Sequence, residues 1–325
     1  MIKPQNIIAQ ISKNVKKMQW KCLVDGCTET AINSHLIQRN GLLSNISVNG
    51  HLIEIKMVDA HKWNSKEPPL KFSLVGIKNA LSHKVFCSSH DTNIFKPIED
   101  ERKDFDSYTS FLLFSYRAIC AEIRKKIINV ENHTRLIDSK ILDFKIDKEQ
   151  LQHIIYRTEL GITDLRAMKS MLENEIQNEE GNYSYYAYTY DSLDIYASAV
   201  FSATDIELPK EDSALELDNI YIHILPLIKE TLILVGYHNN FTNDEMVEYC
   251  KSWSELDQNE LEIKLTNLFT ENIENWGVSP SLYKKFKESN KKKYIKELID
   301  NANYFGIAKS DDFNLFEKKM LSTKN

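Results

Sequence analysis

Four residues in the first third of the sequence have the types and the spacing of metal ligands. Cys22 and Cys27 are separated by four residues, Cys87 and His90 by two, and 59 residues lie between the two pairs. Zn²⁺ prefers four thiolate or imidazole ligands in a tetrahedron, and two close pairs joined by a long loop let one chain supply them. The spacing therefore predicts a single structural Zn²⁺ site.

The residues around each pair favour the same site. Asp25-Gly26 is typical of a turn, which would bring the first two cysteines to one ion. Val85-Phe86 predicts the end of an apolar strand, and Ser88 or Ser89 can cap a helix that ends near Pro97. The competing interpretation is that the cysteines are buried as small apolar side chains, which is common for free cysteine.

The order of these ligands resembles a treble-clef zinc finger, and the HNH endonucleases built on that fold, over about residues 20–99. This resemblance implies metal-dependent hydrolysis of phosphodiester bonds in DNA or RNA. His35 would be the general base and Asp91 a ligand for a catalytic Mg²⁺ or Mn²⁺, while zinc stays structural. The chain departs from the family in three places. Ser34 replaces an acidic residue, Asp91 replaces a final histidine, and Asn79 lies farther from the second pair than the usual asparagine.

The alternative class is a noncatalytic adaptor or regulator that binds nucleic acid or protein, in which zinc replaces a missing core. In a second alternative, His35 replaces His90 as the fourth zinc ligand. A looser likeness, of the form C…C…SH.I/L…FC..HD…F, is to poorly described prokaryotic proteins that look like mobile-element or anti-phage defence genes. That likeness implies a setting and not a reaction.

Charge is distributed unevenly along the chain. Residues 1–100 hold 13 Lys and Arg against 8 Asp and Glu, a net +5, whereas the remaining 225 residues hold 28 against 39, a net −11. A basic module attracts a phosphate backbone, so nucleic acid is the expected partner of residues 1–100. Lys16, Lys17 and Arg39 are the candidate phosphate contacts.

Composition excludes several classes of protein. The 325 residues are 42% hydrophobic and 27% charged, as in an ordinary globular chain, and no apolar stretch reaches the roughly 18 residues of a membrane span. Five unevenly spaced cysteines argue against a disulfide framework, so we expect a reducing, cytoplasmic location. A protein partner or a second copy of the chain would bind through the C-terminal half.

The periodicity of apolar residues predicts an α+β fold in three parts. These are a treble-clef zinc module at 1–100, a helical connector at 101–180, and a mixed α/β domain of unknown role with antiparallel strands at 181–325. We expect helices at 5–17, 107–130, 147–178, 242–252, 258–273, 279–288 and 290–303, with Gly161 a candidate break. We expect strands at 50–58, in the Tyr-rich segment after Gly181, and in a hairpin that turns at Lys229-Glu230.

Other motifs give weaker signals. Glu54-Ile55-Lys56 has the Glu-x-Lys pattern of another nuclease class, but such a short pattern recurs by chance. The Tyr cluster at 183–190 is a candidate stacking platform for bases, with half-buried sheet packing the preferred interpretation. His223 and His238 are interpreted as ordinary sheet histidines, and the lysine run at 287–297 as a solvated helix face. The sequence has no Gly-rich phosphate loop and no Ser nucleophile elbow.

Overall fold

The computed structural model describes residues 3–63, 67–99, 104–143, 145–202, 217–303 and 313–318. The charge of the segment EDERKD at 99–104 predicts a linker, and this segment lies mostly outside these residues.

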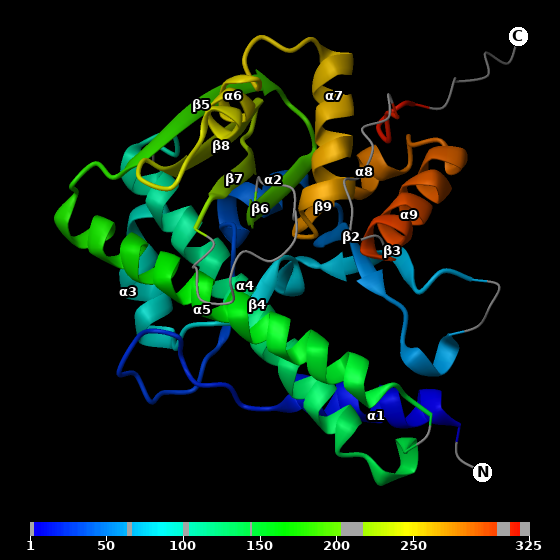
Figure 1. The fold of residues 1–325 in the computed structure, drawn as a ribbon. Coiled ribbons are helices and arrows are strands. Elements are labelled where there is room, and N and C mark those ends of the chain that lie inside the picture. The colour runs from blue at the N-terminus through cyan, green and yellow to red at the C-terminus, as the bar shows by residue number, and fades with distance from the viewer. Residues whose placement is uncertain are drawn as a thin grey trace, which may run out of the picture.

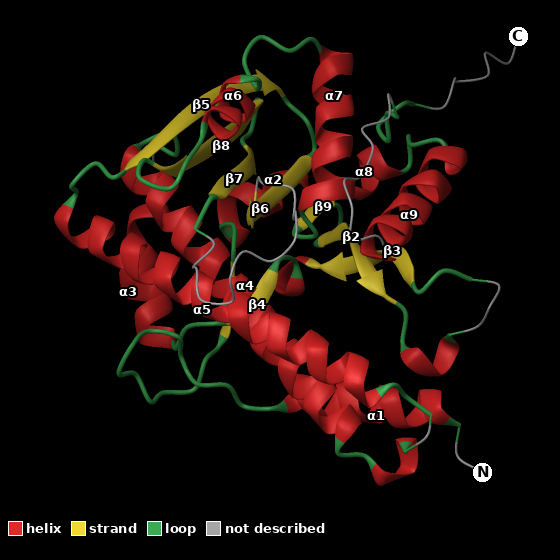
Figure 2. Ribbon diagram, in the orientation of Figure 1, coloured by secondary structure: helices red, strands yellow, loops and turns green. Residues whose placement is uncertain are grey.

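Helices and antiparallel strands follow one another in blocks along the chain (Figure 1; Figure 2). The helices are α1 Pro4–Lys17, α2 Ser44–Ile46, α3 Ser88–Glu99, α4 Tyr108–Ile137, α5 Lys148–Asn178, α6 Asp244–Lys251, α7 Gln258–Asn267, α8 Pro280–Tyr283 and α9 Glu288–Asn303. The strands are β1 Asn33–His35, β2 His51–Met57, β3 Leu70–Gly76, β4 Ser82–Lys84, β5 Tyr183–Asp191, β6 Ile195–Ser202, β7 Asn219–Pro226, β8 Glu230–His238 and β9 Trp276–Val278. Short helical turns are η1 Arg39–Leu43, η2 Ala60–Lys62, η3 Ile77–Asn79, η4 Lys140–Leu142 and η5 Leu268–Asn272. The predicted α+β class is confirmed.

Two long helices, α4 and α5, pack side by side across the molecule (Figure 1). The side chain of Ser107 accepts a hydrogen bond from the Ser110 N–H and caps α4 at its predicted start. Helix α5 continues through Gly161, so the candidate break there does not occur. A glycine costs about 1 kcal/mol in a helix interior, and the packing against α4 outweighs that cost. Within the described residues, no helix is both long and apolar enough to cross a bilayer.

A seven-stranded sheet with the order β3-β2-β9-β6-β7-β8-β5 forms the centre of the fold, and all its neighbouring strands are antiparallel. The predicted hairpin is confirmed as β7 and β8, with Ile222 opposite Val235. Strand β7 is buried on both faces because each face is covered by helices. Ile220, Ile222 and Ile224 pack with α6, α7 and α9. Tyr221 and Leu225 pack in the other core, with α4.

The N-terminal residues contribute to two sheets. Strands β1 and β4 form a separate two-stranded antiparallel sheet, and the chain between them leaves it to form β2 and β3 in the large sheet. Strand β2 pairs with β9, with Ile53 opposite Val278 and Glu54 opposite Gly277. Residues of the predicted zinc module therefore share one sheet with C-terminal residues. The division at residues 100 and 180 stays a prediction.

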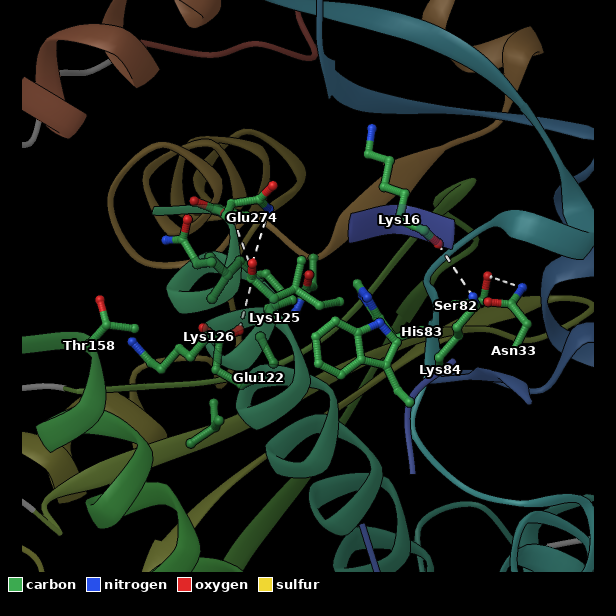
Figure 3. Close-up of a pocket in the computed structure, with 18 of the residues that line it drawn as sticks. Lys16, Asn33, Ser82, His83, Lys84, Glu122, Lys125, Lys126, Thr158 and Glu274 are labelled. Atoms are coloured by element: carbon green, nitrogen blue, oxygen red, sulfur yellow. Dashed lines mark hydrogen bonds and ion pairs between the residues drawn. The ribbon is translucent and has the colours of Figure 1, made fainter. Parts of the chain in front are cut away.

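A cavity of about 770 Å³ lies where these parts meet (Figure 3). Its walls come from the end of α1, the β1–β4 pair, α4, α5, β6 and the segment before β9. The cavity is bordered by the two-stranded sheet that precedes the Cys87–His90 pair.

Candidate metal centre

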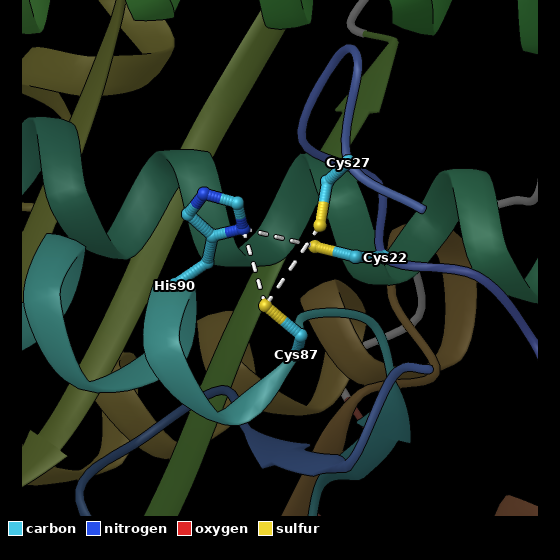
Figure 4. A group of neighbouring side chains, drawn as sticks. All are labelled: Cys22, Cys27, Cys87 and His90. Carbon is cyan, nitrogen blue, oxygen red and sulfur yellow. Dashed lines mark hydrogen bonds between the residues drawn. The ribbon is translucent and has the colours of Figure 1, made fainter. Parts of the chain in front are cut away.

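The four predicted zinc ligands lie together (Figure 4). The Sγ atoms of Cys22, Cys27 and Cys87 and a ring nitrogen of His90 are all within 4.8 Å of one another. The Cys27 and Cys87 sulfurs are 3.9 Å apart, and His90 Nδ1 is 3.4 Å from the Cys22 sulfur and 3.2 Å from the Cys87 sulfur. Two thiolates on a tetrahedral zinc with bonds of about 2.3 Å stand about 3.8 Å apart. The spacing of the donor atoms therefore fits one ion.

A tight turn positions the first cysteine pair. The Cys27 N–H donates to the Val24 carbonyl at 3.1 Å, which closes a turn over Asp25 and Gly26. Gly26 has φ +74°, a left-handed conformation that glycine adopts without steric cost. The Cys22 N–H donates to the Glu29 carbonyl at 2.9 Å and holds the base of the loop. The predicted turn is confirmed, and it brings both sulfurs to the same side.

The second pair lies at the start of α3. The Asp91 N–H donates to the Cys87 carbonyl at 2.9 Å, so Cys87 occupies the helix entrance and His90 the first turn. Residues three apart share one helix face, which directs both side chains to the same point. The two pairs are joined just before α3, where the Leu23 N–H donates to the Val85 carbonyl at 3.0 Å.

Side chains of the two long helices α4 and α5 contact the loop that holds the first cysteine pair. Lys169 of α5 contacts the Asp25 carboxylate at 3.2 Å and Glu173 at 2.8 Å. The guanidinium of Arg124 in α4 donates to the Lys21 carbonyl and lies 5.2 Å from the centre of the Trp20 ring. These contacts fix the loop against α4 and α5, so the ligands do not depend on the local turn alone.

The cluster can supply thiolates, the form in which cysteine binds metal. Donation from the His90 backbone N–H, at the helix start, lowers the pKa of Cys87 below its ordinary value. Burial raises the pKa of Cys22. A buried thiolate needs a compensating cation, and three sulfurs with one imidazole are the donor set that zinc prefers. The residues present therefore fit a structural zinc.

His35 lies outside this group. Its Nε2 is 3.1 Å from the Ile77 carbonyl oxygen, and since a carbonyl only accepts, Nε2 carries the proton. The geometry thus places His90, and not His35, among the four neighbouring ligand atoms. Burial lowers the pKa of His35, and the charges of Arg39 and Arg117 lower it further.

Asp91 faces a buried arginine that sequence reasoning missed. Arg117 Nη2 is 4.0 Å from Asp91 Oδ1, and Nη1 is 2.6 Å from the Glu99 carboxylate. The guanidinium also lies 4.0 Å from the centre of the Phe95 ring. In the sequence, the only sign of this buried arginine is that it is the single cation inside the apolar run FLLFSYRAIC.

No hydrogen bond or ion pair joins His35 to Asp91 in the described chain. Neither residue belongs to a second group of three or more metal-ligating side chains there.

The remaining motifs have structural roles. The Glu54 carboxylate is buried and accepts from the Leu81 N–H and the Tyr196 hydroxyl, while its other oxygen is 2.6 Å from Lys56 Nζ. His223 is buried between the hydroxyls of Ser115 and Ser198.

Sheet packing of the Tyr cluster is confirmed. The hydroxyls of Tyr185, Tyr188 and Tyr190 donate to backbone carbonyls, and Tyr183 is buried. In the lysine run, Lys292 and Lys296 are exposed while Tyr294 and Ile295 are buried, as on an amphipathic helix.

Comparison with known proteins identifies no relative: no family model matches the chain, and neither a curated protein nor a solved structure matches it significantly.

Proposed function

We propose that the chain is a zinc-stabilised, metal-dependent nuclease with an HNH-like module of treble-clef type. The order of elements supports this proposal. A turn carrying two cysteines is followed by β1 with His35, by the antiparallel partner β4, and by α3 carrying the other two ligands. The expected treble clef has the same order, here with the residues of β2 and β3 inserted between its two strands.

The catalytic part of the proposal rests on which ring nitrogen of His35 holds the proton. Because Nε2 donates to the Ile77 carbonyl, Nδ1 of the neutral ring keeps a free lone pair. A general base needs such an acceptor, held in place and unprotonated near neutral pH. The lowered pKa of His35 keeps the ring neutral there. In the reaction, Nδ1 takes a proton from the water that attacks the phosphorus.

Asp91 is the proposed carboxylate ligand for a catalytic divalent ion. Its side chain is 23% exposed and follows His90 directly on α3. A Mg²⁺ or Mn²⁺ ion there would stabilise the charge that develops on the leaving oxygen. Lys16, Lys17 and Arg39, from the basic residues 1–100, would contact the phosphate backbone.

The decisive variant is His35→Ala. The wild type, supplied with Mg²⁺ or Mn²⁺, should cut single-stranded DNA, duplex DNA or RNA, and the variant should lose about 100-fold or more of that rate. Zinc content and thermal stability should stay close to those of the wild type. His61→Ala, at an exposed position, is the matched control and should cut normally. Loss of zinc from His35→Ala, or a wild type that cuts none of the three substrates, would refute the proposal.

Arg117 favours a second candidate function. Its guanidinium already stands beside Asp91, and a cation at that carboxylate would have to overcome this repulsion. In the second candidate, the module binds nucleic acid or protein without cutting, and zinc only stabilises its fold. Nucleic-acid binding that weakens steeply with salt, without cleavage under any divalent ion, would support it. For either candidate function, we propose a role in anti-phage defence. We also propose that the C-terminal half binds a protein partner or a second copy of the chain.

A further inference from the structure

Strand β5 is one outer edge of the seven-stranded sheet. It pairs with β8 along all nine of its residues, from Tyr183 opposite His238 to Asp191 opposite Glu230, and the register skips no residue. Within the described residues no strand lies on its other side, and Figure 1 shows β5 at the margin of the fold. The outer side of such a strand presents N–H and C=O groups with which an extended peptide can pair.

Two hydrogen bonds show which backbone groups of β5 point outward. The Asn182 carbonyl accepts from the Asn239 N–H at 2.8 Å, on the side of β8, whereas the Tyr183 N–H donates to the Tyr108 hydroxyl at 3.2 Å. In an antiparallel strand, the backbone groups of successive residues point to opposite sides. The backbone groups of every second residue after Tyr183 therefore point away from β8. These residues are Tyr185, Ala187, Thr189 and Asp191.

This outer side of β5 is open. Ala187, Thr189 and Asp191 are exposed, and in the described chain their backbone groups make no hydrogen bond outside the ladder with β8. The hydroxyls of Tyr188 and Tyr190 donate to carbonyls in α6 and in the turn after it, so these side chains lie on a face of the sheet. The strand also lacks lysine, proline and a bulge, the features with which proteins commonly block an edge.

The carboxylates beside this edge make its surroundings negative. The Tyr185 hydroxyl donates to the Asp106 carbonyl at 2.6 Å, which places the segment before α4 next to β5. A hydrogen bond with Asp104, burial, and the charges of Asp104 and Glu230 raise the pKa of Asp106. These carboxylates therefore lie close enough to repel one another, and a cation beside them would relieve that repulsion. Asp191 adds a fourth carboxylate, because it lies opposite Glu230 in the register of β5 and β8.

We propose that the β5 edge binds an extended, lysine- or arginine-rich segment of a partner protein as an additional strand. Backbone hydrogen bonds hold the segment, and the carboxylates select its charge. Lys229, which precedes Glu230, offsets only one of these carboxylates. A second copy paired edge to edge fits less well, because it would bring two such sets of carboxylates together. This inference rests on the proposed partner binding by the C-terminal half, and names its surface and the chemistry of the partner.

Fluorescence anisotropy with the full chain tests the proposal, at about 0.15 M salt and without nucleic acid or Mg²⁺. The probes are three labelled peptides of equal length. One alternates lysine and valine, one alternates glutamate and valine, and one alternates lysine and proline. The lysine–valine peptide should bind at least about tenfold more tightly than either of the others, because only it combines positive charge with a backbone that can pair as a strand.

Two substitutions at the edge should weaken binding of the lysine–valine peptide by about threefold to tenfold each. Thr189→Pro removes an outward N–H and leaves the ladder with β8 intact, because that N–H points away from it. Ala187→Lys keeps the backbone and adds a positive charge at the middle of the edge. Leu74→Lys is the matched control, since it adds the same charge at an exposed position of β3, the opposite edge of the sheet. It should bind within about twofold of the wild type.

An Asp191→Asn, Glu230→Gln double variant tests the charge separately and should also weaken binding of the lysine–valine peptide by about threefold to tenfold. Urea unfolding checks that each variant is folded. The proposal fails if the lysine–valine peptide does not bind, if the lysine–proline peptide binds as tightly, or if Leu74→Lys weakens binding as much as Ala187→Lys does. None of these results depends on cleavage, so the nuclease proposal is judged separately.

Discussion

The hydroxyl of Tyr196 donates a hydrogen bond of 2.8 Å to Oε1 of Glu54, and both side chains are buried. This contact joins β6 to β2 across 142 positions of sequence. The same carboxylate oxygen accepts from the Leu81 N–H at 2.8 Å, just before β4. One buried carboxylate thus connects the large sheet to the strand pair that precedes the metal cluster.

Removing the hydroxyl in Tyr196→Phe should lower the free energy of unfolding by about 1–3 kcal/mol, because a buried carboxylate loses a donor. Urea unfolding followed by circular dichroism measures this change. Tyr156→Phe, at a side chain that is 46% exposed, is the control and should change stability by less than about 0.5 kcal/mol. Equal effects of the two substitutions would contradict a structural role for the Glu54 contact.

Gly277 is expected to tolerate no side chain. A Cβ there would stand 2.2 Å from the Tyr196 hydroxyl oxygen, inside the ring's own space. Gly277→Ala should therefore destabilise the protein by about 1–3 kcal/mol or more through overpacking, as measured by thermal or urea unfolding. Gly76→Ala is the matched control, because a Cβ there meets no atom within 4 Å and its φ is not in the left-handed region. A Gly277→Ala protein as stable as Gly76→Ala would show that this packing is wrong.

The metal cluster predicts about one zinc per chain, measured by elemental analysis of the purified protein. Cys87→Ser should lose the metal and expose the turn at Cys22 to proteolysis, because metal binding and folding are coupled. Cys250→Ala changes a buried cysteine of α6 outside the cluster and should keep the zinc. A wild type that is folded without metal, or a Cys87→Ser variant that keeps it, would exclude the site.

His223 predicts a loss of stability in acid. Burial lowers its pKa to about 3 in the folded protein, below the ordinary value of 6.5. As pH falls below 6.5, the unfolded chain binds a proton that the folded chain does not, so stability decreases by about 1.4 kcal/mol per pH unit from this group. Unfolding free energies at pH 7, 6 and 5 should show a smaller decrease for His223→Gln than for the wild type. His61→Gln, at an exposed position, should keep the wild-type slope.

Local chemistry made much of the molecule predictable from the sequence. The Asp25-Gly26 turn, the start of α4 at Ser107 and the β7–β8 hairpin depend on residues within a few positions of one another. The Cys87–His90 spacing likewise places two ligands on one helix face wherever that helix lies. The pairing of this helix with the Cys22–Cys27 turn followed from the preference of zinc for four such ligands.

Only the tertiary structure decided which histidine joins the cysteines, since His35 and His90 were both near them in sequence. It also decided that Glu54 is a buried anchor for Tyr196, and that Arg117 stands beside Asp91. The partners in these two contacts are 142 and 26 positions apart in the sequence, and nothing in the local sequence pattern specifies them. They form because packing the apolar faces of α4 and the sheet brings distant segments together, and a buried charge then takes the partner that this packing supplies.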